Sequence, residues 1–352
     1  DEHGHLANSS NYLDGVLSGY KEVYFPDGRK LLEEKYSGGW LEEVRQFDTL
    51  GKEIARDYFP GGTGRLRLLY PGGRIRAEQN YYRGFFDGVN TSYYFDGSIQ
   101  NVEYYKRGLE DSVYHNYYYG GGLSSEGRFR SGKRNGKWNY YYPDGAISSS
   151  YDFTDGDLDG KRIYYAKNGK IDLEANFKAG LRDGITVKLN PNGSPIYIIR
   201  YEDGVPVAYS FPGNGNQDVP EIGISLQGTK FKTFFPNGQV SRECEYLNGN
   251  LNGKDILYYP NGKIHSLYSN ENGDFEGEMK TYFENGKPET EYLYHLDNMD
   301  GPYREYNENG VLTEEGNYYN GNYHGIVKRY DANGKIKETR KYYYGYLLAI
   351  TK

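Results

Sequence analysis

The residue types that most often carry out chemistry are few and scattered in this sequence. Its histidines are His3, His5, His115, His265, His295 and His324, and its single cysteine is Cys244. No two of them have the spacing of a metal-binding motif, and a lone cysteine forms no disulfide within the chain. His3 and His5 stand beside Asp1 and Glu2, so a weak metal site there is the alternative to a disordered terminus. We therefore predict no catalytic residue, no cofactor and no metal.

Signatures of catalysis are missing as well. The run from Gly61 to Gly64 has the glycine content of a phosphate-binding loop, but no Lys-Ser or Lys-Thr pair follows and no helix is indicated. A nucleophile elbow, a kinase motif set and a dinucleotide-binding fingerprint are absent. The 49 acidic residues are spread along the chain, so no carboxylate pair stands out from a solvated surface. We expect that the chain is not an enzyme.

Composition and charge limit the classes of binding partner that we expect for this chain. The 352 residues include 48 Gly and 42 Tyr, and the net charge is −7 with both signs interspersed. A nucleic-acid-binding protein usually has a basic stripe, so we expect no nucleic acid and no purely electrostatic attachment to anionic lipid. No stretch of 18 apolar residues occurs, so no transmembrane helix is predicted. A core rich in Tyr lies close to water, because each hydroxyl needs a partner.

Glycines recur with a fixed period. The turn glycines that follow an aromatic run are Gly28, Gly51, Gly73, Gly97, Gly121, Gly145, Gly169, Gly193, Gly215, Gly238, Gly262, Gly286, Gly310 and Gly334. Nine of their thirteen intervals are 24 residues, and the others are 22 or 23. Two further series run in step with them. The leading glycines include Gly88, Gly136, Gly253, Gly277, Gly301 and Gly325, and four residues before them stand link glycines such as Gly84, Gly108, Gly132, Gly249, Gly273 and Gly321.

One unit, 253–277, shows what the period encodes. Residues 254–259 and 264–269 are predicted strands, joined by the turn Pro260-Asn261-Gly262-Lys263. Asn-Gly is a strong hairpin signal, and we expect a type I′ turn with positive φ at both residues. Residues 270–276 are predicted to form a loop. The chain is therefore predicted to be all-β, an elongated single-layer antiparallel sheet of about 14 tandem β-hairpin repeats of about 24 residues.

Three rows of large side chains are predicted to form the core ladder, because they keep the same place in every unit. One row, five residues after the leading glycine, contains Tyr93, Tyr117, Tyr141, Tyr165, Tyr258, Tyr282, Tyr306 and Tyr330. A second row, two residues after the turn glycine, contains Ile75, Ile99, Leu123, Ile147, Ile171, Val240, Ile264, Leu312 and Ile336. A third row, six residues further on, contains Tyr81, Tyr105, Phe129, Phe153, Phe177, Tyr201, Tyr246, Tyr294, Tyr318 and Tyr342. The second and third rows share a face, since side chains alternate with period two.

The period fails at one place and the ends differ from the middle. We predict an N-terminal segment or cap over 1–18, an array over 19–204, an irregular repeat or hinge over 205–228, an array over 229–345 and an edge or cap over 346–352. The proline-containing segment 205–228 is either a decayed repeat or a binding loop. The apolar C-terminus is either a cap or an edge that pairs with another chain.

The stretches Phe129–Trp138 and Tyr318–Gly325 resemble the MORN repeat, which has an aromatic residue, Gly, a short polar link, a second Gly, a strand with an aromatic residue and an Asn-Gly turn. The resemblance covers about residues 19 to 345. The form of the units is closer to the variant MORN repeats of bacterial antitoxin-like and surface proteins than to the eukaryotic form. It implies an array of hairpins that acts as a protein-binding or membrane-proximal scaffold, without catalysis.

The face opposite the core ladder and the segment 202–228 are the predicted working surface. The tentative binding residues are Tyr104, Tyr118, Tyr140, Tyr142, Tyr259 and Phe211. We predict a non-catalytic scaffold for a protein partner. The alternatives are a cell-surface protein that stacks exposed Tyr on carbohydrate, and a fibre subunit that self-associates end to end through its edge strands. A first residue other than Met, together with the resemblance, favours a secreted or cell-surface location.

Overall fold

The structure is a computed structural model that describes residues 6–25, 27–70, 72–213 and 219–351. It is all-β, as predicted, and the one helical element in these residues is the 3-10 turn η1 (Pro60–Gly62). The chain forms two compact units, Asp1–Leu158 and Asp159–Lys352. His3 and His5, and the turn at Gly215, lie outside the described residues.

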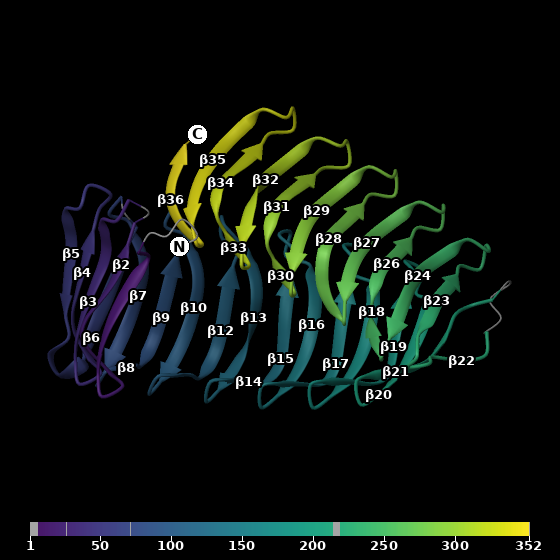
Figure 1. The fold of residues 1–352 in the computed structure, drawn as a ribbon, viewed down its shortest axis with the longest axis horizontal. Coiled ribbons are helices and arrows are strands. Elements are labelled where there is room, and N and C mark those ends of the chain that lie inside the picture. Colours follow the sequence, from purple (N-terminus) through teal and green to yellow (C-terminus); the bar gives the residue numbers. More distant parts are fainter. Residues whose placement is uncertain (1–5, 26, 71, 214–218, 352) are drawn as a thin grey trace. The chain divides into compact units, whose positions relative to one another are not determined.

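The first unit contains a five-stranded sheet followed by a longer series of hairpins (Figure 1). The five-stranded sheet consists of β1 (Asn8–Leu13), β2 (Val16–Tyr24), β3 (Lys30–Ser37), β4 (Trp40–Phe47) and β5 (Glu53–Tyr58). The series that follows consists of β6 (Gly64–Leu69), β7 (Ile75–Tyr82), β8 (Phe85–Phe86), β9 (Gly88–Tyr93), β10 (Ile99–Lys106), β11 (Leu109–Glu110), β12 (Ser112–Tyr117), β13 (Leu123–Arg130), β14 (Lys133–Arg134), β15 (Gly136–Tyr141) and β16 (Ile147–Thr154). Strand pairing starts at Asn8, so the predicted cap over 1–18 already belongs to a hairpin.

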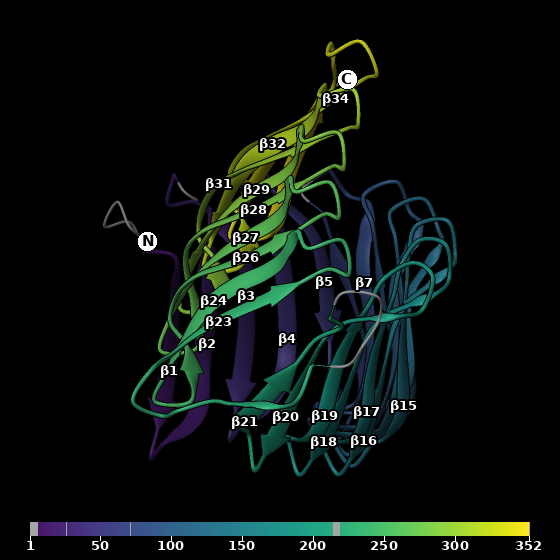
Figure 2. The same ribbon diagram turned by 90° about the vertical axis from the view of Figure 1, so that its right-hand side faces the viewer.

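The second unit begins within β17 (Asp157–Tyr165). Its first strands are β17, β18 (Ile171–Lys178), β19 (Leu181–Leu189), β20 (Pro195–Glu202), β21 (Val205–Ser210) and β22 (Ile222–Gly223). The C-terminal sheet has 14 strands: β23 (Thr229–Phe234), β24 (Val240–Leu247), β25 (Asn250–Leu251), β26 (Gly253–Tyr258), β27 (Ile264–Glu271), β28 (Asp274–Tyr282), β29 (Pro288–His295), β30 (Asn298–Met299), β31 (Gly301–Tyr306), β32 (Leu312–Tyr319), β33 (Asn322–Tyr323), β34 (Gly325–Tyr330), β35 (Ile336–Tyr343) and β36 (Tyr346–Thr351). Figure 2 shows its hairpins following one another in chain order.

The hairpins are divided among several antiparallel sheets, whereas the repeat alone suggested one continuous sheet. One interruption lies between β5 and β6, where Pro60 has no backbone N–H to donate and Gly61 has a φ of 61°. A small core of Leu41, Val44, Phe59 and Leu66 joins the two sheets there. The other interruption lies between β22 and β23, inside the segment predicted to be irregular.

The turn glycines have positive φ, as predicted, and the four tested values are 81° at Gly262, 88° at Gly286, 81° at Gly310 and 77° at Gly334. The predicted type I′ geometry is wrong. Asn261 does not have positive φ, and the Gly262 N–H donates to the Tyr259 carbonyl over 2.9 Å. This is a type I turn closed by a left-handed glycine, the form that Pro260 favours because its ring holds φ negative. The Asn261 side chain accepts a hydrogen bond from the Lys263 N–H at 2.9 Å.

Type I′ turns occur instead at the opposite ends of the strands, at the link glycines. In the Asn272-Gly273 turn, φ is 52° and 101°, and the flanking residues Glu271 and Asp274 are paired. Similar values occur at Arg83-Gly84, Arg107-Gly108, Ser131-Gly132, Asn248-Gly249 and Asn320-Gly321. The Gly273 N–H also donates to the Leu251 carbonyl of the preceding unit at 2.9 Å. The predicted loop is therefore a second tight hairpin, and each unit contributes one turn to each edge of the sheet.

The face predicted for the first Tyr row is wrong. The position two residues after the leading glycine is buried in several units, where Trp138, Tyr303 and Val327 are 1–2% exposed. Tyr141, Tyr165, Tyr258, Tyr282, Tyr306 and Tyr330 are only half-buried. Since Tyr141 is three residues from Trp138 along β15, the two side chains point to opposite faces. The third row was placed correctly, because Phe129 and Phe153 pack on Trp138 with ring centroids 5.1 and 6.3 Å away. Phe153 is buried, whereas Phe129 and Phe177 are half-buried.

The irregular segment is part of the core of the second unit. Tyr209 on β21 and Phe231 on β23 have ring centroids 4.4 Å apart, and both belong to a buried cluster with Tyr197, Ile199, Tyr201, Cys244 and Tyr246. The short strand β22 pairs with β21 through Tyr209 and Ile222. The described part of 205–228 therefore connects β20 and β24 by packing, which a detached binding loop would not do.

Candidate functional site

The face opposite the buried position, here called the outer face, carries a row of alternating charge in the C-terminal sheet. Strand register places Lys280, Glu291, Arg304, Glu315 and Lys328 side by side across β28, β29, β31, β32 and β34. Lys328 Nζ is 3.2 Å and Arg304 Nε is 3.9 Å from the Glu315 carboxylate. Neighbours of opposite charge stabilise adjacent strands and leave the row close to neutral.

The half-buried tyrosines of the first row bind the carboxylates of the outer face. Tyr330 Oη donates to Glu315 Oε1 at 2.6 Å, and partial burial with this bond raises the pKa of Tyr330 to about 12. The hydrogen bond from Tyr330, followed by that from Lys328, lowers the pKa of Glu315. The same bond, always to a glutamate 15 residues earlier, joins Tyr93 to Glu78, Tyr141 to Glu126, Tyr258 to Glu243 and Tyr306 to Glu291. The row predicted to form the core thus links units across the outer face.

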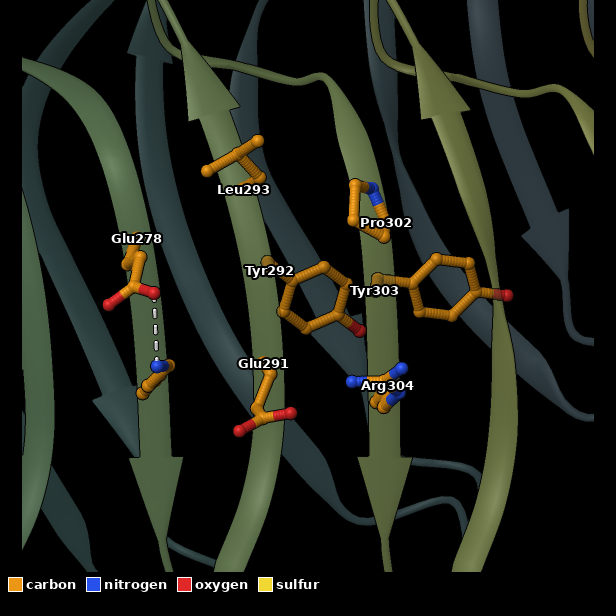
Figure 3. Close-up of a pocket in the computed structure, with 8 residues that line it drawn as sticks. Glu278, Glu291, Tyr292, Leu293, Pro302, Tyr303 and Arg304 are labelled. Atoms are coloured by element: carbon orange, nitrogen blue, oxygen red, sulfur yellow. Dashed lines mark ion pairs between the residues drawn. The ribbon is translucent and has the colours of Figure 1, made fainter.

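A shallow groove of about 250 Å³ opens between β28, β29 and β31 (Figure 3). Its lining residues are Glu278, Lys280, Glu291, Tyr292, Leu293, Pro302, Tyr303 and Arg304. Leu293 is 38% exposed and lies over Gly301, where an added Cβ would come within 2.8 Å of it. Lys280 and Glu278 form an ion pair at 3.1 Å on one side, and that bond raises the pKa of Lys280. The groove therefore offers an apolar notch between paired charges.

Three of the predicted binding tyrosines occupy a structural position at the type I turns. Tyr118 Oη donates to the Tyr141 carbonyl at 2.5 Å, and Tyr259 Oη donates to the Tyr282 carbonyl at 2.8 Å. In both cases the acceptor lies 23 residues further along the chain. Tyr142 holds the equivalent position in its own unit. The hydroxyls of Tyr118 and Tyr259 therefore connect successive turns.

The other three predicted residues have different surroundings. Tyr140 is half-buried on the same face as Trp138, with its ring 5.0 Å from Tyr151, so its predicted orientation is wrong. Phe211 is half-buried and packs on Tyr209 and Phe234, with ring centroids at 6.4 and 5.7 Å. Tyr104 does face outward, is 37% exposed and is paired with Val89. Within the first unit, Tyr104 and Tyr140 therefore lie on opposite faces.

The surroundings shift the pKa values of the single cysteine and of two histidines. Burial raises the pKa of the Cys244 thiol to about 12, which disfavours the reactive thiolate. Burial lowers the pKa of His265, and a hydrogen bond to Glu276 raises that of His295. Within the described part of the chain, no three His, Cys, Asp or Glu residues are grouped to hold a metal ion. In the same residues, no helix has the length and apolar character needed to cross a membrane.

Sequence reasoning missed the residue that follows each link glycine. In the first unit this position holds exposed apolar side chains in some hairpins, among them Trp40, Phe85 and Leu109 at 46, 56 and 50% exposure, and the charged Lys133 and Asp157 in others. In the C-terminal sheet it holds Asn250, Asp274 and Asn322. The difference between apolar and polar residues at this position is visible in the periodic sequence, but the position falls in a segment predicted to be a loop.

A family model for the MORN repeat variant matches the chain five times, at residues 158–179, 228–248, 275–295, 299–320 and 323–343. This is a MORN-repeat protein. The five matches fall on the repeats from β17 to β35, and they agree with the hairpin units observed there.

Other comparisons add little to this assignment. The chain is 12% identical to a crystal structure of TcdB2-TccC3, with 97% of this chain and 27% of that chain covered and a TM-score of 0.16. It is 9% identical to a structure of the Photorhabdus luminescens Tc holotoxin pore with a TccC3-D651A mutation, covering 93% and 22%, again at a TM-score of 0.16. The chain spans about a quarter of the length of these structures, and scores so low support no functional inference. No curated protein matches the sequence.

Proposed function

We propose that this MORN-repeat protein is a non-catalytic scaffold that binds a protein partner through the outer face of its C-terminal sheet. The groove around Leu293 carries the proposal, because it is an apolar notch bordered by Lys280, Glu291 and Arg304. Protein interfaces combine an apolar centre with a polar rim in this way. The paired charges form the polar rim of this surface. Because each charge already has a partner of opposite sign, a bound protein need not supply one.

The carbohydrate alternative has less support from the arrangement of the tyrosines. Stacking on a sugar polymer needs a repeated row of open aromatic faces, whereas the hydroxyls of Tyr118 and Tyr259 are bound to neighbouring turns. A secreted or cell-surface location stays a prediction of the sequence, and fractionation of the source cells tests it.

The test compares capture of proteins from the native source by three forms of the intact chain. Leu293→Lys places a charge in the groove, and Ile326→Lys changes an equally apolar residue, 46% exposed, on β34 outside it. We expect one protein to be enriched on the parent chain and on Ile326→Lys, and lost on Leu293→Lys. The proposal would be overturned if Leu293→Lys captured the same protein as the parent chain. It would also be overturned by strong binding to a glycan panel that Tyr104→Ala abolishes.

A further inference from the structure

Five consecutive type I turns of the C-terminal sheet contain the pair Asn-Gly, and they lie along one edge of that sheet (Figure 1). The asparagines are Asn237, Asn261, Asn285, Asn309 and Asn333, and all five are exposed. An asparagine before glycine readily loses its side-chain amide, because glycine has no side chain to hinder attack by its backbone nitrogen on the asparagine Cγ. The five turns carry the same reactive pair, so the contacts of each asparagine decide how readily it reacts.

The first three asparagines are held at both ends of the side-chain amide. Nδ2 of Asn237, Asn261 and Asn285 donates to a backbone carbonyl of the next turn at 3.0, 3.1 and 2.9 Å. Oδ1 of the same residues accepts a hydrogen bond from the backbone N–H two residues later, at 3.0, 2.9 and 2.8 Å. An amide fixed in this way cannot rotate towards the following nitrogen without losing two hydrogen bonds.

Asn309 and Asn333 make neither of these bonds. Within the residues that the structure describes, their side chains have no hydrogen-bond partner. Their turns begin with Asn307 and Asp331, whereas the first three begin with an aromatic residue. Asn307 Oδ1 accepts the Val311 N–H at 3.1 Å, and Asp331 makes the equivalent bond at 3.0 Å. The polar residue that opens the turn thus replaces the asparagine as acceptor, which leaves the asparagine amide free to rotate.

A lysine distinguishes Asn309 from Asn333. Lys287 Nζ donates to the Asn309 backbone carbonyl at 2.8 Å. This carbonyl belongs to the peptide bond whose nitrogen must lose its proton before it attacks Cγ. The cation therefore stabilises the negative charge that develops on that peptide bond. In the next turn Val311 takes the place of Lys287, so Asn333 has no such cation from the preceding turn.

We propose that Asn309, freed by Asn307 and activated by Lys287, converts spontaneously to isoaspartate and aspartate in the folded chain. The Gly310 nitrogen loses its proton to solvent and bonds to Cγ of Asn309. The bond from Cγ to Nδ2 breaks, and the Nδ2 group takes up a proton and leaves as ammonia. Water then opens the resulting succinimide at one of its two carbonyls. The reaction needs only water, so this inference is independent of the proposed scaffold function.

Conversion changes both the charge and the length of this turn. Opening the ring at the former Asn309 backbone carbonyl gives isoaspartate, which adds one methylene group to the backbone between β31 and β32. The free carboxylate of that product contains the oxygen that Lys287 contacts, so the two groups become an ion pair. Opening at the other carbonyl gives aspartate, with the same gain of one negative charge at the edge of the sheet.

The experiment incubates the intact folded chain at mildly alkaline pH and follows each Asn-Gly pair by peptide mass spectrometry, with fragmentation that separates isoaspartate from aspartate. We expect Asn309 to convert first and Asn333 next. Asn285 is the matched comparison, because its carbonyl accepts a bond from Lys263 at 2.7 Å while its side chain is held. It should convert at least about tenfold more slowly than Asn309, since two hydrogen bonds must first break. In urea all five pairs should convert at similar rates.

Two variants separate the two contacts. Asn307→Tyr restores an aromatic residue at the start of the turn, so that Asn309 Oδ1 can accept the Val311 N–H. Conversion of Asn309 should then slow about tenfold. Lys287→Met removes the cation and should slow Asn309 severalfold while leaving Asn333 unchanged. Circular dichroism confirms that each variant is folded before the incubation starts.

Three results would overturn the proposal. The first is conversion of Asn285 as fast as that of Asn309 in the folded chain. The second is an intact Asn309 in the folded chain after the same pair has converted in urea. The third is an unchanged rate at Asn309 in either variant, because Asn307 or Lys287 would then have no part in the reaction.

Discussion

The same buried position is filled in opposite ways by one hairpin of each unit. In the first unit it holds Trp138, whose indole lies against Gly127 and donates to the Arg128 carbonyl at 3.2 Å. In the C-terminal sheet it holds Asp255, whose two carboxylate oxygens accept bonds of 2.8 and 2.7 Å from Arg242. Both side chains are almost completely buried. The repeat therefore specifies a position and its burial, and the neighbouring strand decides which residue type is tolerated there.

The largest loss of stability is expected when one partner of the buried Arg242–Asp255 ion pair is removed. Arg242→Ala leaves the Asp255 carboxylate buried without its cation, which should cost about 3–5 kcal/mol. Amide hydrogen exchange over β23–β29 measures the loss. The double variant Arg242→Leu, Asp255→Leu should recover most of the protection, since an apolar pair of similar size removes the uncompensated charge. A double variant as unprotected as the single one would show that the position needs the ion pair.

The second largest loss of stability is expected when a methyl group is added at Gly127, the glycine that faces Trp138. A Cβ on Gly127 would lie 2.2 Å from the indole, so Gly127→Ala should destabilise the first unit by about 1–3 kcal/mol. Urea unfolding followed by tryptophan fluorescence reports on this unit, because Trp40 and Trp138 both lie in it. Gly122→Ala, where the nearest atom is 3.6 Å away, should change stability by less than about 0.5 kcal/mol. Equal effects of the two substitutions would contradict the close packing of Trp138.

The type I turns should respond alike in both units, because their geometry is the same. Gly145→Val and Gly262→Val place a β-branched residue at φ of 87° and 81° and should each cost about 1 kcal/mol or more. Asparagine tolerates this conformation, so the matching Gly→Asn variants should be milder. Local amide exchange next to each turn gives the comparison. Unchanged exchange in both valine variants would reject the turn assignment.

The smallest effect is expected at the Tyr–Glu bonds of the outer face. Tyr141→Phe and Tyr330→Phe should each cost about 0.5–1.5 kcal/mol at pH 7. The pKa of Glu315 is lowered in the folded chain, so its contribution is complete above the ordinary value of 4.5 and is lost as pH falls through the folded pKa. The penalty of Tyr330→Phe should therefore shrink in acid. A penalty that is constant from pH 7 to pH 3 would separate Tyr330 from the Glu315 carboxylate.

The faces predicted for Tyr140 and Tyr141 were wrong for a reason that can be traced to one residue per unit. The type I turn with its left-handed glycine shifts the register, so that Leu257 pairs with Ser266 but Tyr258 pairs with Ile264. When side chains are assigned to alternate faces across such a turn, the assignment changes face at the turn. This error reversed the predicted faces of the Tyr141 and Tyr140 rows. The hydrogen bonds of Tyr118 and Tyr259 could not be predicted from local sequence, because their acceptors lie on the next unit, 23 residues away.

The sequence by itself determined the repeat, the hairpins and the positive φ of the turn glycines, because each depends on local backbone preferences that recur every 24 residues. Tertiary structure decided which face is buried, since tyrosines occur on both faces and only their neighbours distinguish Tyr303 from Tyr306. It also decided the breaks after β5 and β22 and the pairing of Arg242 with Asp255. These depend on strand register, which brings together side chains that local preference treats as independent.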